Sequence, residues 1–256
     1  MNRENKGRRR EAEWFEDEDF WTAYAPLMFD EAKWAEVPGA VDGIERLASP
    51  PEGGFVLDLC CGVGRHSVEF ASRGYRVTGI DITSAYLEAA RESAGAAGLE
   101  VEFLRRDARD FSRPGAFDLC VNLFTSFGYF GSREEDLGML ALCASNLKPG
   151  GCLVLETIGK EVAARDFVES EEFDRAGWRV RTEYRIEGAW EAEVNRWILE
   201  REGLRIDRSF SLRLYSGFEM KEALLKAGFT TAAVYGGLDG RPYDQKAETL
   251  AAVAKR

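Results

Sequence analysis

Apolar runs and helical patterns alternate along the middle of the chain, between residues 55 and 157. Short apolar runs predict five strands, near 55–59, 76–80, 101–105, 117–122 and 152–157. Apolar residues at helical spacing predict three helices, near 65–73, 84–97 and 133–147. Strands that alternate with helices are typical of a parallel sheet with helices on its faces. We therefore expect an α/β fold.

A further helix and two strands follow near the end of the chain. Ser216 with Glu219 forms a capping box, which predicts a helix that ends at about Ala227. Apolar runs near 230–235 and 249–254 predict two more strands. These strands are expected to complete the sheet.

Between residues 178 and 214 the apolar residues recur at every second position, which indicates strands. Turns at Gly188 and Gly203 divide the stretch into three. We expect an antiparallel three-stranded meander, inserted between the fifth strand and the last helix. The apolar residues that define it are Trp178, Val180, Tyr184, Ile186, Trp190, Ala192, Val194, Leu204, Ile206, Phe210, Leu212 and Leu214.

One position in this meander breaks the alternation. Trp197 is out of phase with Val194, which predicts a β-bulge between them. The meander is expected to serve either as a lid over a ligand pocket or as a dimerisation element, because an apolar sheet face suits both.

An aromatic-rich segment precedes the first strand. Its rings either pack in the core or form a helical cap that folds across a ligand pocket and excludes water. We therefore divide the chain into three parts. Residues 1–50 form an N-terminal tail and aromatic helical cap, residues 51–160 and 215–256 form the core, and residues 161–214 form the inserted sheet.

The charge of the chain limits its partners. The formal net charge of −11 argues against general affinity for nucleic acid or for an anionic membrane surface. Lys6, Arg8, Arg9 and Arg10 form one basic cluster, in a polar segment without apolar periodicity, and a solvated tail is expected there. The chain shows no signal sequence and no run of 18 apolar residues, so membrane insertion is not expected.

The cysteines and the histidine limit the chemistry further. Five cysteines without a CxxC pair suit buried reduced thiols, and hence a cytoplasmic protein. His66 is the only histidine, so a multi-histidine metal site is excluded and no metal site is predicted.

The strand at 55–59 leads into a helix through a glycine loop. Gly62 and Gly64 let the backbone turn sharply and approach a ligand, and the following helix directs free N–H groups at that ligand. Asp81 ends the next strand, seventeen positions after Gly64, where it can accept both hydroxyls of a ribose. This arrangement predicts a nucleoside derivative as ligand.

Three residues favour S-adenosylmethionine over a nicotinamide dinucleotide. Ser67 occupies the position where the dinucleotide fingerprint needs glycine or alanine. Asp58 precedes the glycines, where a carboxylate would repel a pyrophosphate but can hold the ammonium of a methionine moiety. Asp107 follows the third strand and can accept a hydrogen bond from an adenine amine.

These residues resemble the class I S-adenosylmethionine-dependent methyltransferases. The likeness rests on the loop at 58–64, on Asp81, on Asp107 and on the segment Leu147-Lys148-Pro149-Gly150-Gly151. It implies a Rossmann-like, mostly parallel sheet of seven strands with the last strand antiparallel. Residues 123–130 resemble the corresponding segment of amino-sugar N,N-dimethyltransferases. Cys60 departs from the family, which usually has glycine there, and a left-handed backbone at a cysteine would cost about 1 kcal/mol.

The resemblance and the loop geometry together predict the site residues. The donor is expected to contact Asp58, Cys60, Gly62, Gly64, Asp81, Ile82, Asp107, Ala108, Asn122 and Leu123. Candidate bases are Tyr129, His66 and Tyr24, and candidate substrate contacts are Ser126, Arg241 and Tyr243. The dipole of the following helix should keep His66 neutral. Each candidate also has a purely structural interpretation, as a packing, turn or pocket-wall residue.

We therefore predict a methyltransferase that moves a methyl group from S-adenosylmethionine to an N or O atom of a small molecule and releases S-adenosylhomocysteine. The alternatives are an NAD-dependent oxidoreductase and a non-catalytic module that binds S-adenosylmethionine. A homodimer through the inserted sheet is expected as the protein partnership.

Overall fold

The computed structural model describes residues 13–256. The predicted basic tail at Lys6, Arg8, Arg9 and Arg10 therefore lies outside the described residues. Within residues 13–256, no helix has both the length and the apolar character needed to cross a membrane.

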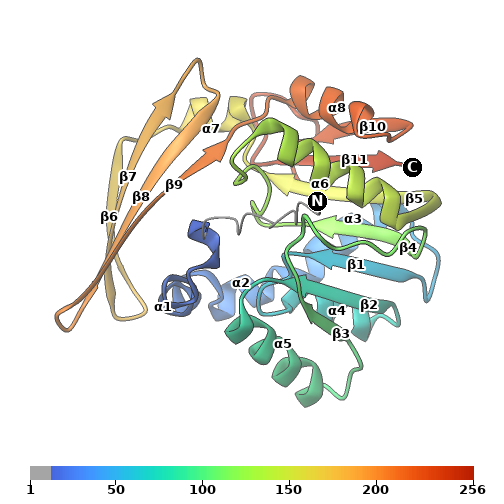
Figure 1. Ribbon diagram of the computed structural model, residues 1–256, viewed down its shortest axis with the longest axis horizontal. Coiled ribbons are helices and arrows are strands. Elements are labelled where there is room, and N and C mark those ends of the chain that lie inside the picture. The colour runs from blue at the N-terminus through green and yellow to red at the C-terminus, as the bar shows by residue number, and fades with distance from the viewer. Residues whose placement is uncertain (1–12) are drawn as a thin grey trace, which may run out of the picture.

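A seven-stranded sheet forms the centre of the larger part of the molecule (Figure 1). In spatial order its strands are β10 (Thr231–Tyr235), β11 (Leu250–Lys255), β5 (Leu147–Thr157), β4 (Phe117–Asn122), β1 (Phe55–Leu59), β2 (Arg76–Asp81) and β3 (Glu102–Arg105). Strand β11 is antiparallel to both of its neighbours, and the other strand pairs are parallel. The predicted Rossmann-like α/β sheet is confirmed.

Helices cover both faces of this sheet, so its central strands are apolar on both sides. Neighbouring residues of β1 show this, because Val56 and Leu57 belong to two separate hydrophobic cores. One core packs under α3 (Val37–Ala48) and α4 (Arg65–Ser72), with α5 (Ser84–Ala96) beside them.

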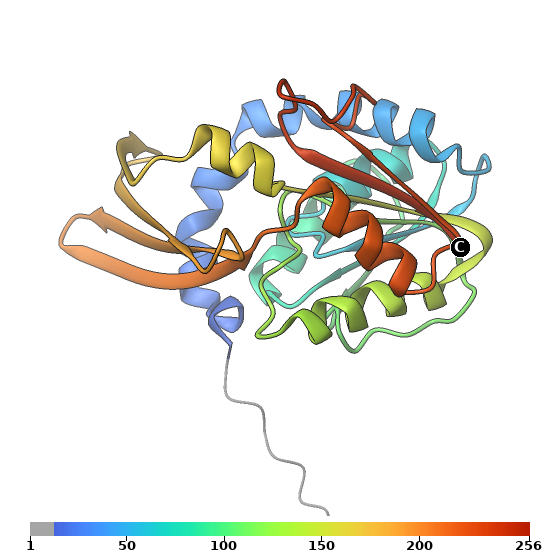
Figure 2. The same ribbon diagram turned by 90° about the horizontal axis from the view of Figure 1, so that it is seen from above.

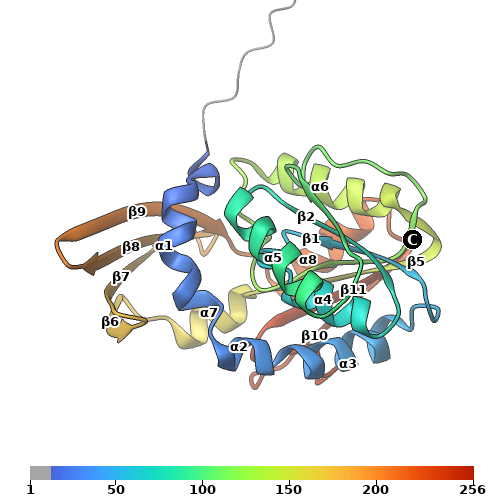
Figure 3. The same cartoon turned by 90° about the horizontal axis from the view of Figure 1, so that it is seen from below.

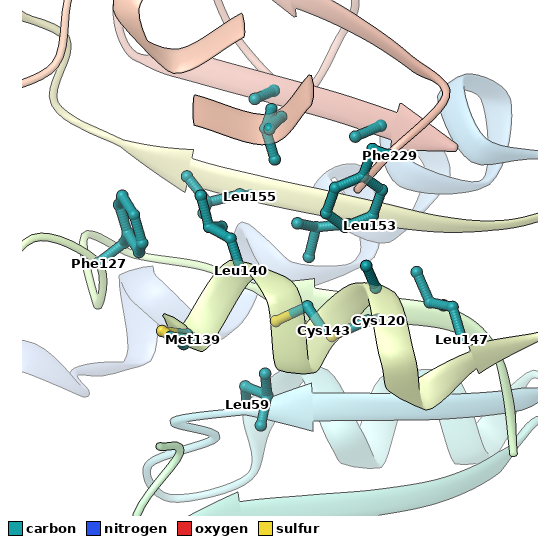
Figure 4. Close-up of a cluster of buried hydrophobic side chains, with 14 of the residues drawn as sticks. Leu59, Cys120, Phe127, Met139, Leu140, Cys143, Leu147, Leu153, Leu155 and Phe229 are labelled. Carbon is teal, nitrogen blue, oxygen red and sulfur yellow. The ribbon is translucent and has the colours of Figure 1, made fainter. Parts of the chain in front are cut away.

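The other core packs under α6 (Arg133–Asn146) and α8 (Gly217–Lys226). Leu140 and Cys143 of α6 lie against Leu153 and Leu155 of β5 (Figure 4). The predicted capping box of α8 is present in both directions, between the residues Ser216 and Glu219. It satisfies two of the N–H groups that a helix start leaves unpaired.

A separate antiparallel sheet follows helix α7 (Lys160–Asp166) and projects to one side of the core (Figures 1 and 2). Its strands, in spatial order, are β6 (Ser170–Arg175), β7 (Trp178–Glu187), β8 (Ala192–Arg201) and β9 (Leu204–Arg213). The prediction of a three-stranded meander therefore missed one strand, because the sheet has four. Strand β6 was missed because all six of its residues are exposed and it carries no apolar alternation.

The predicted bulge at Trp197 is wrong. Strand β8 pairs residue by residue with both neighbours, and Trp197 lies directly between Thr182 and Arg208. Because side chains alternate between faces, Trp197 shares a face with Glu193 and not with Val194. The inner face of this sheet is therefore partly polar.

The N-terminal segment bridges the two sheets. It consists of a short 3₁₀ helix η1 (Trp14–Glu16), α1 (Glu18–Met28) and α2 (Glu31–Ala35), and α1 lies between the sheets (Figures 1 and 3). The Tyr86 hydroxyl donates to the Trp21 carbonyl at 2.7 Å on the core side. Arg208 of β9 donates to Asp17 at 2.6 Å on the other side. Leu27 packs in one cluster with residues of the four-stranded sheet.

Candidate functional site

A cavity of about 740 Å³ lies between the core sheet, α1 and the inner face of the four-stranded sheet. The parallel strands of the core point their carboxyl ends at it (Figure 1), which is where open α/β sheets bind ligands. Its volume falls in the range of small-molecule sites. The predicted site residues that line it are Tyr24, Asp58, Cys60, Gly62, His66, Asp81, Ile82, Asp107, Ala108, Leu123, Ser126 and Tyr129.

Four predicted site residues do not line this cavity: Gly64, Asn122, Arg241 and Tyr243. Arg241 is paired with Asp239 and Glu248. The Tyr243 hydroxyl donates to Glu161 at 2.7 Å. Both side chains are therefore engaged with neighbouring carboxylates, one of which, Glu248, lines the cavity.

The glycine loop turns through three left-handed residues. Cys60 has φ 58°, Gly62 has φ 56° and Gly64 has φ 75°. The left-handed backbone at Cys60 means that the loop keeps the geometry expected of glycine there, at a cost of about 1 kcal/mol. A side chain at Gly62 would come within 3.2 Å of the Phe29 ring, so this glycine leaves the cavity wall open.

Asp81 fastens this loop to the end of β2. Its two carboxylate oxygens accept the Gly62 N–H at 2.8 Å and the Thr83 N–H at 2.9 Å. Burial raises the pKa of this carboxyl group, while the two backbone N–H groups lower it. Each oxygen keeps a further lone pair, so the carboxylate can still accept a ligand hydroxyl.

Asp58 lies at the tip of β1, buried beneath the loop. The Ser67 hydroxyl donates to it at 2.6 Å, which gives a role to the residue that breaks the dinucleotide fingerprint. Burial, with a smaller contribution from the nearby Asp81, raises the pKa of Asp58 to about 7, although the hydrogen bond from Ser67 opposes the shift. A ligand cation here would favour the charged carboxylate.

Asp107 is held in place by an arginine two residues later. Arg109 donates to both carboxylate oxygens, with the shortest contact 2.6 Å from Nη2 to Oδ2. The guanidinium also lies over the rings of Phe15 and Phe130, 5.2 and 4.7 Å from their centres. Asp107 is thereby connected to the cap and to the loop after β4.

Asn122 ends β4 and is completely buried. Its amide donates to the Leu59 carbonyl at 3.0 Å, which ties the tips of β4 and β1 together. Its Oδ1 atom has no hydrogen-bond partner within residues 13–256. A buried acceptor without a partner is costly, so it points to a donor that the protein itself does not supply.

The loop after β4 carries backbone strain. Phe124 and Thr125 both have φ 57°, although neither is glycine. Glu156 supports the loop, since its backbone carbonyl accepts the Thr125 N–H at 3.2 Å and its side chain accepts the Phe124 N–H at 3.3 Å. Such strained loops are typical of functional sites. Ser126 donates to the Leu123 carbonyl at 2.9 Å.

The three candidate bases line the cavity but differ in what they can do. Burial raises the pKa values of Tyr24 and Tyr129, so both phenols stay protonated at neutral pH. Burial, followed by the charge of Arg65, lowers the pKa of His66 to about 3. His66 is therefore neutral at neutral pH, and burial is the main cause of its lowered pKa.

The inserted sheet contributes cavity residues that the sequence interpretation missed. They are Glu171, Arg175, Tyr184, Glu193, Asn195, Trp197, Phe210 and Leu212. The alternation along β8 contained the signal for Glu193 and Asn195, but the predicted bulge hid it. A polar residue at every second position of a strand beside a cavity marks the ligand-facing side.

Comparisons with known proteins agree with this geometry. A family model described as a methyltransferase domain matches residues 56–151. The chain is 29% identical over 207 residues to a dTDP-3-amino-3,4,6-trideoxy-alpha-D-glucopyranose N,N-dimethyltransferase of Streptomyces venezuelae, covering 75% of this chain and 81% of that protein. It is 30% identical over 129 residues to a ubiquinone biosynthesis O-methyltransferase of Actinobacillus pleuropneumoniae serotype 7 (strain AP76). This match covers 50% of this chain and 55% of that protein. The chain spans about half the length of several curated relatives.

A solved structure is similar over almost the whole chain. It is an amino pentose methyltransferase from Micromonospora echinaspora with S-adenosylmethionine bound, and it is 25% identical with a TM-score of 0.64. The similarity covers 93% of this chain and 96% of that one. The sheet order, the glycine loop and the match of residues 56–151 to a methyltransferase domain agree with one another, and together they support a class I S-adenosylmethionine-dependent methyltransferase.

Proposed function

We propose that this protein transfers a methyl group from S-adenosylmethionine to an N or O atom of a small-molecule acceptor and releases S-adenosylhomocysteine. The observation that carries the proposal is that one cavity joins a donor end and an acceptor end. Three carboxylates, Asp58, Asp81 and Asp107, line it at the ends of three strands. The cavity continues to an aromatic wall, and its volume leaves room for a second molecule.

The donor fits the residues at the core end of the cavity. Asp81 would accept the ribose hydroxyls, Asp107 the adenine amine, and Asp58 the ammonium of the methionine end. Asn122 does not line the cavity, and the hydrogen bond from its amide to the Leu59 carbonyl would support the site from behind by tying the ends of β4 and β1 together. Cys60, Gly62 and Gly64 would shape the backbone around the ligand, while Ile82, Ala108 and Leu123 supply apolar contacts.

The bound donor supplies a methyl group already activated by its sulfonium. The protein therefore has to orient the acceptor and to exclude water. Trp14 and Tyr24 of the cap close one side of the cavity, and Tyr129 lies in the loop after β4. The phenols of Tyr24 and Tyr129 remain protonated at neutral pH. We therefore propose that these two tyrosines position the acceptor by hydrogen bonds. His66, neutral and buried, can accept a hydrogen bond, but its lowered pKa makes it a poor base.

The relatives suggest both kinds of acceptor atom. One is named for methylating a dTDP-amino sugar at nitrogen, the other for an O-methylation in ubiquinone biosynthesis. We propose Ser126 as an acceptor contact because it lines the cavity. Arg241 and Tyr243 do not line the cavity, so we do not propose them as contacts of the acceptor.

A screen of acceptors tests the proposal directly. The full chain is incubated with S-adenosylmethionine and panels of amines, phenols and carboxylates, and S-adenosylhomocysteine release is measured. We expect release with at least one small-molecule panel. Donor binding without turnover on any panel would favour the non-catalytic module. A thermal-unfolding midpoint raised by NADH but not by S-adenosylhomocysteine would favour the oxidoreductase.

Three broader predictions are kept as proposals. We propose a cytoplasmic location, which the five free cysteines support. We propose that residues 51–160 and 215–256 act as the donor-binding core and residues 161–214 as a lid, with α3 joining the core because it packs there.

We propose a homodimer through the inserted sheet, supported by the exposed edge strand β6. Sedimentation equilibrium of the full chain tests the dimer.

A further inference from the structure

The four-stranded sheet presents a set of side chains to the cavity that the proposed donor site does not use. Tyr184 of β7, Asn195 of β8 and Phe210 of β9 are direct neighbours across the strands. Glu193 and Trp197 lie on either side of Asn195 on the same face. All five line the cavity.

Glu193 is a carboxylate of this wall, on β8. It is partly buried, and burial raises the pKa of its carboxyl group. A side-chain hydrogen bond with Asn195 lowers this pKa in part, and within residues 13–256 no lysine or arginine forms an ion pair with Glu193. The charge of Glu193 in turn contributes, after burial, to the raised pKa of Tyr129, and both residues line the same cavity. A partly desolvated carboxylate without a cation favours a cationic ligand.

Two indole N–H groups at the same end of the cavity also lack partners. Nε1 of Trp14 and Nε1 of Trp197 are buried without a hydrogen-bond acceptor in the described part of the chain. The Trp14 ring is stacked on Phe210, with 4.2 Å between the ring centres, and lies edge-on to Tyr129 at 5.1 Å. Buried tryptophan N–H groups usually find a partner, so these two unmade hydrogen bonds would favour a ligand oxygen if a small shift of the rings turned them to the cavity.

The charges on this wall are unfavourable for an anion. Glu171 also lines the cavity, so this wall carries two carboxylates, Glu171 and Glu193. The cation of this wall among residues 13–256 is Arg175, which is already paired with Asp30. The surrounding aromatic rings add further attraction for a cation through their negative faces.

We infer that the inner face of the four-stranded sheet is the acceptor subsite, and that the acceptor is a phosphate-free small molecule whose amine lies against Glu193. Ring oxygens or hydroxyls of the acceptor would meet the indole N–H groups of Trp14 and Trp197. This inference rests on the proposed function and narrows its acceptor from N or O to an amine.

The position of Glu193 also accounts for the proton. An amine arrives as its ammonium form, R–NH₃⁺, and passes one proton to the Glu193 carboxylate. The freed lone pair of nitrogen then forms the new N–C bond while the S–C bond of the donor breaks, and that bond's electron pair stays on sulfur. The product leaves as R–NH₂⁺–CH₃. Transfer to this carboxylate is eased because the apolar surroundings favour both neutral forms.

The test uses Glu193→Gln in the full chain, with Glu200→Gln as matched control. Glu200 lies on the same strand but on the opposite, exposed face. Binding of tyramine, tryptamine and D-glucosamine to enzyme saturated with S-adenosylhomocysteine is measured by calorimetry, and methylation is measured with S-adenosylmethionine. We expect at least one amine to bind and react. Glu193→Gln should lower its kcat/KM by about 100-fold, as loss of a buried charge partner does.

Separate outcomes overturn the inference and the proposed function. Both variants should bind S-adenosylhomocysteine within about twofold of the wild type, since neither residue touches the donor end. If donor binding is intact but no phosphate-free amine binds or reacts, or if Glu193→Gln matches Glu200→Gln, the inference is wrong. Methylation of a thymidine diphosphate amino sugar in preference to the free amines would also overturn it. Failure to bind S-adenosylhomocysteine at all would instead overturn the proposed function.

Discussion

Asp81 shows how one carboxylate can serve both the fold and the ligand. Its carboxylate accepts the backbone N–H groups of Gly62 and Thr83, and the residue also lines the cavity. We expect Asp81→Ala to weaken S-adenosylhomocysteine binding more than tenfold, or at least about 1.4 kcal/mol, by calorimetry. Asp174→Ala, at an exposed position of β6, is the control. Unchanged affinity in Asp81→Ala would contradict the donor assignment.

Asp58 makes a pH-dependent prediction. Its pKa, about 7 in the folded protein, lies above the ordinary value of 3.8. The folded state therefore holds this proton more tightly than the unfolded state, and the free protein loses stability as pH rises from about 4 to 7. Ser67, Asp81 and Arg65 are the groups that face Asp58, and they are the same in the variant. Asp58→Asn should remove this part of the pH dependence.

The measurement compares thermal-unfolding midpoints of the wild type and Asp58→Asn at pH 5 and pH 8. The wild type should lose stability relative to the variant as pH rises. A ligand ammonium favours the charged carboxylate, so wild-type affinity for S-adenosylhomocysteine should increase over the same range while that of the variant stays flat. Parallel pH profiles for the two proteins would show that Asp58 does not titrate there.

Gly64 can be tested separately from ligand binding because it does not line the cavity. Its φ is 75°, and an added Cβ would lie 2.8 Å from the Cβ of Ala90 and 3.0 Å from the Phe103 ring. We expect Gly64→Ala to lower the free energy of unfolding by about 1–3 kcal/mol, measured by urea denaturation. Gly138→Ala, at an exposed position of α6 with open space around it, should instead be neutral or stabilising.

At the scale of elements, the alternation of apolar residues predicted most of the core and failed where that signal is absent. Strands β1, β2 and β4 are buried on both faces, so their apolar runs were found within one residue of their bounds. In the sheet, strand β6 pairs only with β7, and it carries almost no apolar residue. Glu193 was missed for a related reason, since a ligand-facing strand position need not be apolar.

Asp136 on α6 connects elements that the sequence gives no reason to join. It accepts from Arg213 of β9 and from the Tyr215 hydroxyl, each at 2.7 Å. The backbone N–H of Arg213 in turn donates to the Gly128 carbonyl, and its side chain donates to the Phe130 carbonyl. The inserted sheet thereby fixes the loop that carries Tyr129.

We therefore expect Asp136→Ala to lower both stability and turnover. Removing one partner of a buried pair should reduce the free energy of unfolding by about 2 kcal/mol or more by urea denaturation. It should lower kcat while leaving S-adenosylhomocysteine affinity nearly unchanged, because the donor end does not depend on this contact. Glu134→Ala, exposed on the same helical turn, is the control. Equal losses in the two variants would contradict a positioning role.

At the scale of the whole molecule, cap, core and inserted sheet share one cavity and should fold as one unit. The apolar cluster on the inserted sheet is completed by Leu27 of the cap, and the cap is bonded to both sides through Trp21 and Asp17. All six tryptophans lie in the cap and the inserted sheet, whereas most helices lie in the core. Tryptophan fluorescence therefore reports the first two parts, and far-UV circular dichroism mainly reports the core.

The two probes should give coincident thermal transitions if the parts unfold cooperatively. S-adenosylhomocysteine at 100 times its Kd should stabilise the native state by about 2.7 kcal/mol and move both transitions together, because ligand binding stabilises every part that unfolds with its site. A fluorescence transition that comes earlier and does not respond to the ligand would show that the cap and inserted sheet open independently. In that case the core could bind the methyl donor first, and the wall bearing Glu193 would close around the acceptor afterwards.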